Sequence, residues 1–477
     1  MKRYLSAVII FLITISSLFG QSTAIAFQEQ TTEIKIGGLF PLTGSLALGG
    51  KERESAFRMA IQQINNDPTL LPGKILVPLT QDTGTDPHTG EKAAQDLIDN
   101  GVVALIGASS SAVSAAIAGG PSKDNQIPQI SYSSTTPSLS NKTAYPYFLR
   151  VVPSDILQIR GIVELVNYFG WDYISIIRSA NIYSQAVSSQ VGSTNQQNSA
   201  EVGVNSFESE AKNFNIQVVQ TQVINTTMDI TPQLRQIKLF GSNIILLNVY
   251  LADAIKVFEV ASDLGMTSKE GYVWIGTDSA SQSEVLEASS KVNDAMQGLI
   301  GLKPLQPQNA AFTHFLDLWE QCAGRNTSEY FGCGDRNPNI YAPFAYDATY
   351  FLAHAIQKMV ESGQDYTNGE LLLTQLKSQT IDGITGKITL DQNGDRLSGY
   401  DVINVQGNNF VDIGTWEIFN GVTQNLPVFW QGSSEGELNT PIAKLASSWI
   451  LLISLVLLPL IIYFIRKVWE FRRRKVV

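Results

Sequence analysis

Residues 34–65, IKIGGLFPLTGSLALGGKERESAFRMAIQQIN, join a short strand pattern to a longer helix pattern. The first seven residues form an apolar, β-type run, and a loop rich in Gly and Ser follows. Phe57, Ala60, Ile61 and Ile64 then recur at helical spacing on one face. A strand followed by an amphipathic helix is the repeating unit of a parallel α/β sheet.

The same alternation continues along most of the chain. Helix patterns followed by strand patterns occupy residues 91–108, 112–133, 162–179, 234–250 and 252–278. Strands separated by helices predict parallel sheets with helices on both faces. The length of this region suits two such units joined by a hinge rather than one domain.

The two ends of the chain carry targeting patterns. Residues 1–26 have two basic residues, an apolar stretch and small residues near position 26, which predicts a secretory signal peptide; a retained membrane segment is the alternative. Residues 445–465 are apolar and long enough to span a bilayer as a helix. The basic tail 466–477 then predicts a cytoplasmic C-terminus. We therefore expect a single-pass protein of the cell membrane, with residues 27–435 outside and a linker at 436–444.

Charge, cysteines and short motifs limit the binding partners and covalent modifications that we expect. The formal net charge is -10 and basic residues cluster at the C-terminus, so nucleic acid is not expected to bind. Cys322 and Cys333 are the only cysteines, and in an oxidising compartment we expect them to form a local disulfide; a metal or redox pair is the alternative. Asn141, Asn225 and Asn326 begin Asn-x-Ser/Thr triplets, which are candidate glycan sites if the source is eukaryotic.

Hydroxyl side chains gather in two loops that follow strand patterns. Residues 109–111 are three serines placed directly before a helix pattern, and residues 133–136 read SSTT. Ligands of open α/β folds bind at the carboxyl ends of parallel strands, where loops enter helix N-termini. The two loops therefore favour a site for an anion or an amino acid, with helix capping as the alternative.

Little in the sequence suggests catalysis. The chain has three histidines, no Gly-x-Ser-x-Gly motif and no zinc-ligand spacing, so we expect no enzyme activity, no metal and no cofactor. Asn393 and Gly394 lie between two strand patterns and predict a hairpin. Asp391, Asn393 and Asp395 depart from the spacing of a calcium-binding loop, which leaves the turn as the preferred interpretation.

A family resemblance becomes specific over residues 127–183, IPQISYSSTTPSLSNKTAYPYFLRVVPSDILQIRGIVELVNYFGWDYISIIRSANIY. This stretch resembles the ligand-binding domain of class C G-protein-coupled receptors, the metabotropic glutamate receptors most of all. Wider similarity, from about residue 33 to 430, is to the bilobed Venus flytrap family, which includes GABA-B receptor ectodomains and periplasmic leucine/isoleucine/valine-binding proteins. The resemblance implies a type I periplasmic-binding-protein fold, with two Rossmann-like lobes and a three-crossing hinge. It implies a first lobe of about 33–152 and 280–378, and a second of about 153–279 and 379–430.

The resemblance also implies a set of ligand-binding residues. Ser110 or Ser111, with Ser133 and Thr135, match the hydroxyls that hold an amino acid's α-carboxylate. Asp155 and Asp278 match acids that face its ammonium, and Tyr183 matches a tyrosine that covers the ligand from the second lobe. Arg53 lies where glutamate receptors place an arginine for the distal carboxylate, and this match is weaker because basic residues are common there. Blocks 341–359 and 383–396 are further similar segments.

Two functions remain open at this point. One is a membrane-anchored extracellular receptor-like protein that closes a cleft around an α-amino acid or a close analogue, with an unidentified signalling partner. The other is a membrane-tethered binding subunit of an ABC-type amino-acid importer. Glutamate, glycine, GABA-like compounds and branched-chain amino acids are all candidate ligands. The resemblance also makes a homo- or heterodimer through the first lobe plausible.

Overall fold

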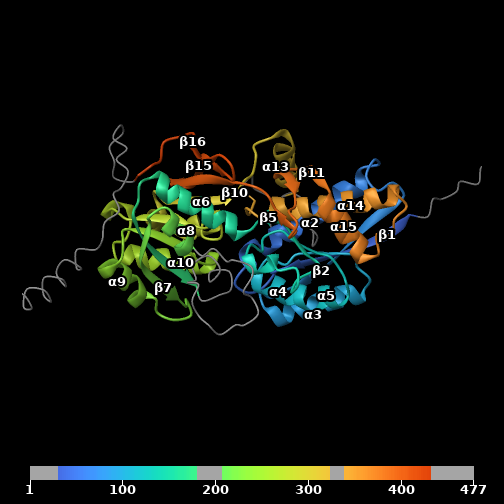
Figure 1. Ribbon diagram of the computed structural model, residues 1–477, viewed down its shortest axis with the longest axis horizontal. Helices are drawn as coiled ribbons and strands as arrows, with labels where there is room; N and C mark the ends of the chain where they lie inside the picture. Colours follow the sequence, from blue (N-terminus) through green and yellow to red (C-terminus); the bar gives the residue numbers. More distant parts are fainter. Residues whose placement is uncertain (1–30, 180–206, 323–332, 334–337, 431–477) are drawn as a thin grey trace, which may run out of the picture.

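The structure is a computed structural model that describes residues 31–179, 207–322, 333 and 338–430. These residues form two α/β lobes that lie side by side along the long axis of the molecule (Figure 1). The expected signal peptide, linker, membrane anchor and basic tail lie outside the described residues. Among the described helices, none combines the length and the apolar character needed to cross a membrane.

The first lobe is built on a six-stranded sheet whose neighbouring strands are all parallel. In sheet order its strands are β13 (Asp395–Arg396), β5 (Phe148–Pro153), β4 (Gln129–Ser131), β3 (Leu105–Ile106), β1 (Thr32–Phe40) and β2 (Lys74–Asp82). A separate two-stranded antiparallel ribbon consists of β11 (Thr380–Gly383) and β12 (Gly386–Thr389). The strand pattern at residues 34–40 therefore lies within the predicted parallel sheet, as β1.

The second lobe is built on an eight-stranded mixed sheet. In sheet order its strands are β16 (Gly421–Gln424), β15 (Asn409–Glu417), β14 (Tyr400–Gln406), β10 (Ile300–Pro304), β9 (Val273–Gly276), β8 (Ile244–Asn248), β6 (Tyr173–Ser179) and β7 (Gln217–Ile224). The strands from β7 to β10 are parallel, and β14, β15 and β16 continue the sheet in antiparallel pairs.

Helices accompany both sheets. Those of the first lobe are α2 (Ala47–Asn66), α3 (Pro87–Asp99), α4 (Ser111–Gly119), α5 (Pro121–Asp124), α13 (Ala310–Cys322), α14 (Ala342–Glu361) and α15 (Gly369–Ser378). Those of the second lobe are α6 (Asp155–Tyr168), α8 (Phe207–Asn213), α9 (Thr231–Phe240), α10 (Leu251–Asp263), α11 (Ser283–Leu286) and α12 (Ser290–Met296). Short 3-10 turns occur at η1 (Pro137–Ser140) and η2 (Ser268–Glu270).

Each sheet has a hydrophobic core on both of its faces, and β8 shows why. Ile244 and Leu246 pack into the core that includes residues of α6, whereas Ile245 and Leu247 pack into the core that includes residues of α10. Successive strand residues point to opposite faces, so a strand covered on both sides reads as a continuous apolar run. Each fully buried aliphatic side chain of this kind contributes about 1.5–3 kcal/mol relative to an exposed one.

The lobes differ from their expected boundaries. Residues 280–304 were expected in the first lobe, but β10 pairs with β9 and β14 in the second sheet. Residues 379–396 were expected in the second lobe, but β13 pairs with β5, and Ile384 and Ile388 lie in the first-lobe core. An alternation of strands and helices identifies the elements without saying which sheet a late strand joins, because that choice depends on long-range pairing.

Of the hairpin predicted around Asn393 and Gly394, the turn is correct and the pairing of two strands is not. Gly394 has a φ of +72° and its N–H donates to the carbonyl of Asp391 at 2.9 Å. The strand segments on either side meet at a single antiparallel bridge, Leu390 to Arg396. The next strand, β14, pairs with β10 instead, because the chain crosses to the other lobe directly after β13.

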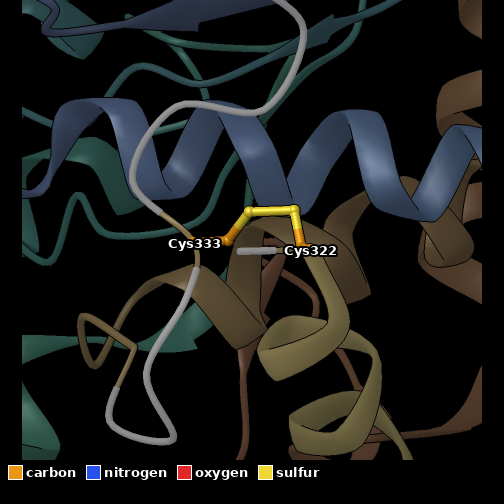
Figure 2. The surroundings of a disulfide bond; sticks show 2 residues. All are labelled: Cys322 and Cys333. Atoms are coloured by element: carbon orange, nitrogen blue, oxygen red, sulfur yellow. A yellow bond between two sulfur atoms is a disulfide. The ribbon is translucent and has the colours of Figure 1, made fainter. Parts of the chain in front are cut away.

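The two cysteines form the predicted disulfide. Cys322 at the end of α13 is bonded to Cys333, with a Cα–Cα distance of 5.8 Å (Figure 2). Cys322 is buried in the first-lobe core, and Cys333 packs against the same core. The bridge therefore fixes Cys333 to the end of α13, and neither sulfur is a free thiolate that could bind a metal.

Arg150 organises the region where the chain leaves the first lobe. Its side chain is fully buried on β5, and its Nε donates to Asp395 Oδ1 on β13 at 2.7 Å. The other guanidinium nitrogens donate to the Ser140 hydroxyl at 2.7 Å and to the carbonyls of Ser134 and Thr136 at 3.2 and 2.9 Å. The Arg150 side chain thus connects β5 and β13, the two strands next to the hinge, to the loop that follows β4.

Replacing Asp395 with Ala should remove about 3–5 kcal/mol from the free energy of unfolding, because it leaves the buried Arg150 charge without its counterion. Urea denaturation followed by circular dichroism measures this change. Asp382→Ala is the matched control, since Asp382 pairs with Lys387 at an exposed site and should have little effect. Similar losses in the two variants would contradict the organising role of the buried pair.

Candidate functional site

The two hydroxyl loops lie next to each other at the carboxyl ends of β3 and β4. Ser110 is the N-cap residue of α4, and its side chain makes no capping hydrogen bond. Ser111 Oγ receives the N–H of Thr136 at 3.4 Å, which links the two loops. Ser110, Ser111 and Thr135 are all buried, and Ser133 is half-buried.

Part of the hydroxyl cluster serves the fold. Ser133 Oγ donates to the carbonyl of Ser109 at 3.0 Å, and Ser134 Oγ donates to the carbonyl of Ala108 at 3.0 Å. Ser131 Oγ also donates to the Ala108 carbonyl, at 2.7 Å. A hydroxyl has a single proton to donate, so in this arrangement Ser133 can only accept another hydrogen bond. The number of hydroxyls in the sequence therefore overstates the donors that remain for an anion.

Asp155 lies two residues after the end of β5 and is the first residue of α6. Its side chain is fully buried, and neither carboxylate oxygen has a hydrogen-bond partner among the described residues. The Thr135 hydroxyl approaches the carboxylate without reaching hydrogen-bonding geometry. Burial raises the pKa of Asp155 well above its usual value, and the nearby Asp278 carboxylate raises it further.

Asp278 approaches from the second lobe, in the segment that follows β9. It is fully buried, and its Oδ1 accepts the N–H of Ser279 at 2.8 Å. Its Oδ2 accepts a hydrogen bond from the hydroxyl of Tyr341, which lies in the first lobe at the start of α14. Asp155, at the start of α6, and Asp278, after β9, thus share one buried region of the second lobe where it meets the first, and a cation would relieve their repulsion.

Tyrosines surround this acidic pair. Burial raises the pKa of Tyr341, and Asp278 and Asp155 add to the shift. Burial raises the pKa of Tyr400 for the same reasons, and its hydroxyl lies 3.4 Å from the carbonyl of Ser154. Burial also raises the pKa of Tyr250 to about 12, against the effect of a hydrogen bond with Ser110. Neutral hydroxyls and aromatic rings therefore line the region near the two acids.

Several of these contacts join the two lobes. Besides Tyr341 with Asp278 and Tyr250 with Ser110, Asn339 Nδ2 of the first lobe donates to Gln282 Oε1 at 2.8 Å and to a Glu284 oxygen at 2.6 Å. The lobes are therefore in direct contact at the site, which explains why Asp155 and Asp278 are fully buried.

Arg53 on α2 supports the same junction. It is buried, and its guanidinium donates to Asn339 Oδ1 at 3.1 Å and to Ser109 Oγ at 2.8 Å. It also lies over the Tyr341 ring, 5.2 Å from the ring centre. The structure thus places Arg53 beside the candidate site, where protein groups already occupy part of its hydrogen-bonding capacity.

Comparison with known proteins identifies the family. Residues 52–408, most of the chain, match the family model described as "Receptor family ligand binding region". The chain belongs to this receptor ligand-binding family. The similarity to metabotropic glutamate receptors predicted from the sequence is therefore confirmed.

Members of this receptor ligand-binding family with curated names include plant, animal and amoebal proteins. The chain is 25% identical over 423 residues to "Glutamate receptor 3.7" of Arabidopsis thaliana, covering 83% of this chain and 42% of that protein. It is 26% identical over 468 residues to "Metabotropic glutamate receptor 6" of Oryctolagus cuniculus, covering 79% and 51%. It is 29% identical over 276 residues to "Metabotropic glutamate receptor-like protein E" of Dictyostelium discoideum, covering 57% and 31%. The aligned regions therefore span about half or less of these relatives.

The structure places most of the predicted site residues of this family member in one neighbourhood. Ser110, Ser111, Thr135, Asp155 and Asp278 converge where the lobes meet. Ser133 and Arg53 lie beside them with existing protein partners. Tyr183 and Asn326 lie outside the described residues. Asn225 is exposed and Asn141 half-buried, and within the described ranges no His, Cys, Asp or Glu side chains gather as a metal site.

Several residues at the site, among them Tyr250, Asn339 and Tyr341, were missed by the sequence analysis. Tyr250 directly follows β8, so the rule that ligands bind at carboxyl ends of strands could have identified it. Asn339 and Tyr341 precede α14 and bear no motif that marks them. They reach the site because the second hinge crossing brings α13 and α14 back to the first lobe after β10.

Asp155→Asn should stabilise the ligand-free protein at neutral pH. Because the pKa of folded Asp155 is raised, the wild-type free energy of unfolding should fall as pH rises above about 4, the usual pKa of an unfolded aspartate. The Asn variant lacks this ionisation and should melt at a higher temperature than the wild type at pH 7, with a smaller difference at pH 4.

Melting temperatures from pH 4 to pH 8 measure the effect. Asp124→Asn, at an exposed position of the first lobe, serves as the control and should follow the wild type. If the difference in melting temperature between the wild type and Asp155→Asn stays constant over this pH range, the proposed burial of an ionisable Asp155 is ruled out.

Proposed function

We propose that this chain is a receptor-type ligand-binding protein whose two lobes close around an α-amino acid or a close analogue. The observation that carries the proposal is the Asp155 carboxylate, which is fully buried, has no hydrogen-bond partner among the described residues, and faces a second buried acid. Burying two such groups costs stability, and an ammonium group between them would offset that cost. The names of the relatives, glutamate receptors of two kinds, support an amino-acid ligand.

The carboxylate of the amino acid would lie at the start of α4. The N–H groups of the first turn of a helix have no intrahelical partners, and the helix dipole favours an anion there. Ser110 and Ser111 lie at this helix start, and Thr135 belongs to the adjacent loop. Ser133 would contribute as a donor only after its bond to the Ser109 carbonyl breaks. An ammonium site and a carboxylate site would thus be supplied by neighbouring strands.

The side-chain end of the ligand is the less constrained end. Arg53 is a buried cation in contact with the first hydroxyl loop, but Asn339 and Ser109 already accept two of its hydrogen bonds. An acidic side chain would have to compete with these partners. Glutamate, glycine, GABA-like compounds and branched-chain amino acids therefore remain in the proposed ligand class.

Closure of the lobes would depend on contacts that only the closed form makes. Tyr341 with Asp278 and Tyr250 with Ser110 join the two lobes and would be contacts of this kind. We place Tyr183 among the closing residues as well, on the family resemblance alone. A ligand shifts such an equilibrium by its differential affinity for the closed form, so contacts that span both lobes would determine the response.

We favour the role of a receptor over that of an importer subunit because the relatives are named as receptors. We further propose that the chain is anchored by residues 445–465 with the lobes outside the cell. The support is the apolar run itself, followed by Arg466, Lys467 and further basic residues.

An amino acid that binds should raise the melting temperature of the purified protein, because a ligand that binds only the native state stabilises it. We expect at least one of the twenty amino acids or GABA to do so, and its N-acetyl and carboxamide derivatives to have no effect. Asp278→Asn should weaken the response by tenfold or more in apparent affinity, on the order of one lost charge-assisted bond. An N-acetylated amino acid that binds as tightly as the parent would remove the role of the two acids.

Protease added to intact cells should release the two lobes and leave a tag placed after Val477 intact. The reason is the expected orientation, with the basic tail on the cytoplasmic side. Immunoblotting for the tag gives the result, and cells permeabilised with detergent provide the control in which the tag is digested. Loss of the tag from intact cells would overturn the proposed topology.

A further inference from the structure

Gln158 is a second buried polar side chain on the same turn of α6 as Asp155. It is fully buried, and neither its amide nitrogen nor its amide oxygen has a hydrogen-bond partner in the described part of the chain. Gln129 and Gln379 are also buried, but the amide nitrogen of each donates to a backbone carbonyl, at 3.0 and 2.6 Å. Gln158 therefore differs from these two buried glutamines, whose amides serve the fold.

The spacing of Gln158 and Asp155 brings their side chains together. Residues three apart on a helix lie on one face, about 5–6 Å apart at Cβ. Helical side chains also lean toward the N-terminus of their helix, so Gln158 extends back over the turn that carries Asp155. The four buried polar atoms of these two residues thus lie on one face of the first turn of α6, next to the hinge crossing.

The groups around this turn define what could bind there. Asp155 lies within electrostatic range of Asp278, Tyr341, Tyr400 and Tyr250 and close to Thr135, and Arg150 is the cation whose charge reaches it. Arg150 itself is paired with Asp395 and bonded to three further acceptors. The region is therefore acidic and neutral-polar, which suits a cationic donor. The amide oxygen of Gln158, on the same helix turn as Asp155, supplies a further acceptor to such a donor.

We propose that Gln158 is a further ligand-contacting residue, whose amide oxygen accepts one N–H of the ligand's ammonium alongside Asp155 and Asp278. This inference rests on the proposed function, and it narrows the ligand class to primary ammonium compounds. A primary ammonium has three N–H donors for the three acceptors, whereas each N-methyl group removes one donor and adds bulk in a buried space.

Gln158→Met separates a ligand contact from a structural role, because Met keeps the length of the side chain and removes both polar amide atoms. If the amide has no partner in the fold, the variant should melt at or above the wild-type temperature, since an unpaired buried amide no longer has to be desolvated. Its affinity for an amino acid should fall about tenfold, the effect of one hydrogen bond to a charged group. Opposite signs for stability and binding are the expected signature.

The probes are three matched pairs: glycine with sarcosine, L-glutamate with N-methyl-L-glutamate, and L-leucine with N-methyl-L-leucine. Calorimetric titration of the full chain gives the affinities, and thermal denaturation gives the melting temperatures. In the wild type the primary amine of a responding pair should bind more tightly than its N-methyl partner, and Gln158→Met should reduce that preference. Gln379→Met is the control, which loses its bond to the Phe351 carbonyl and should melt lower while binding unchanged.

Each outcome decides the proposal. Wild-type affinity and N-methyl discrimination in Gln158→Met would overturn it and leave the proposed function standing. A lower melting temperature for Gln158→Met would assign the amide to the fold and also overturn it. If no primary amine of the three pairs or of the wider amino-acid screen binds the wild type, the proposed function fails, and this inference fails with it.

Discussion

The buried ion pair between Arg150 and Asp395 is the interaction on which the arrangement of the site depends. Arg150 lies on the strand that leads into Asp155, and Asp395 lies on the short strand that precedes the third hinge crossing. Because the guanidinium also bonds the carbonyls of Ser134 and Thr136, the same side chain holds the hydroxyl loop in place. One buried guanidinium therefore holds two hinge crossings and one site loop. The cost of desolvating this charge is offset only when all of its partners are in place.

The candidate site carries a cost that the rest of the fold must offset. Asp155 and Asp278 come from separate segments of the second lobe, brought together where burial and the neighbouring Asp278 carboxylate raise the pKa of Asp155. A protein selected for stability alone would place apolar side chains there. Both lobes can bear the cost because each sheet has a core on both faces, with large aromatic residues such as Trp171 and Trp416 fully buried. Buried, unpaired polar groups in an otherwise satisfied fold are a physical indication of a binding site.

The contacts between the lobes give the site its second property. Asn339 and Tyr341 from one lobe meet Gln282, Glu284 and Asp278 from the other through side-chain hydrogen bonds. These contacts between described side chains are polar, whereas apolar cores hold each lobe together. Polar contacts of this kind suit two bodies that separate and meet again, because water can replace each hydrogen bond when the lobes separate.

The sequence by itself determined the local elements and the chemistry of the site. Apolar runs such as residues 244–247 predicted buried strands, and the serine loops were identifiable because ligand sites of parallel sheets follow strand ends. Asp155 was identified by the family resemblance. Tertiary structure alone decided which sheet β10 and β13 join, and that Asn339, Tyr341 and Gln158 lie buried around the hinge. It also decided that Ser133 donates to the Ser109 carbonyl. The physical reason is range: periodicity and strand-end position are properties of neighbouring residues, whereas sheet membership, burial and hydrogen-bond partners depend on residues far away in the chain.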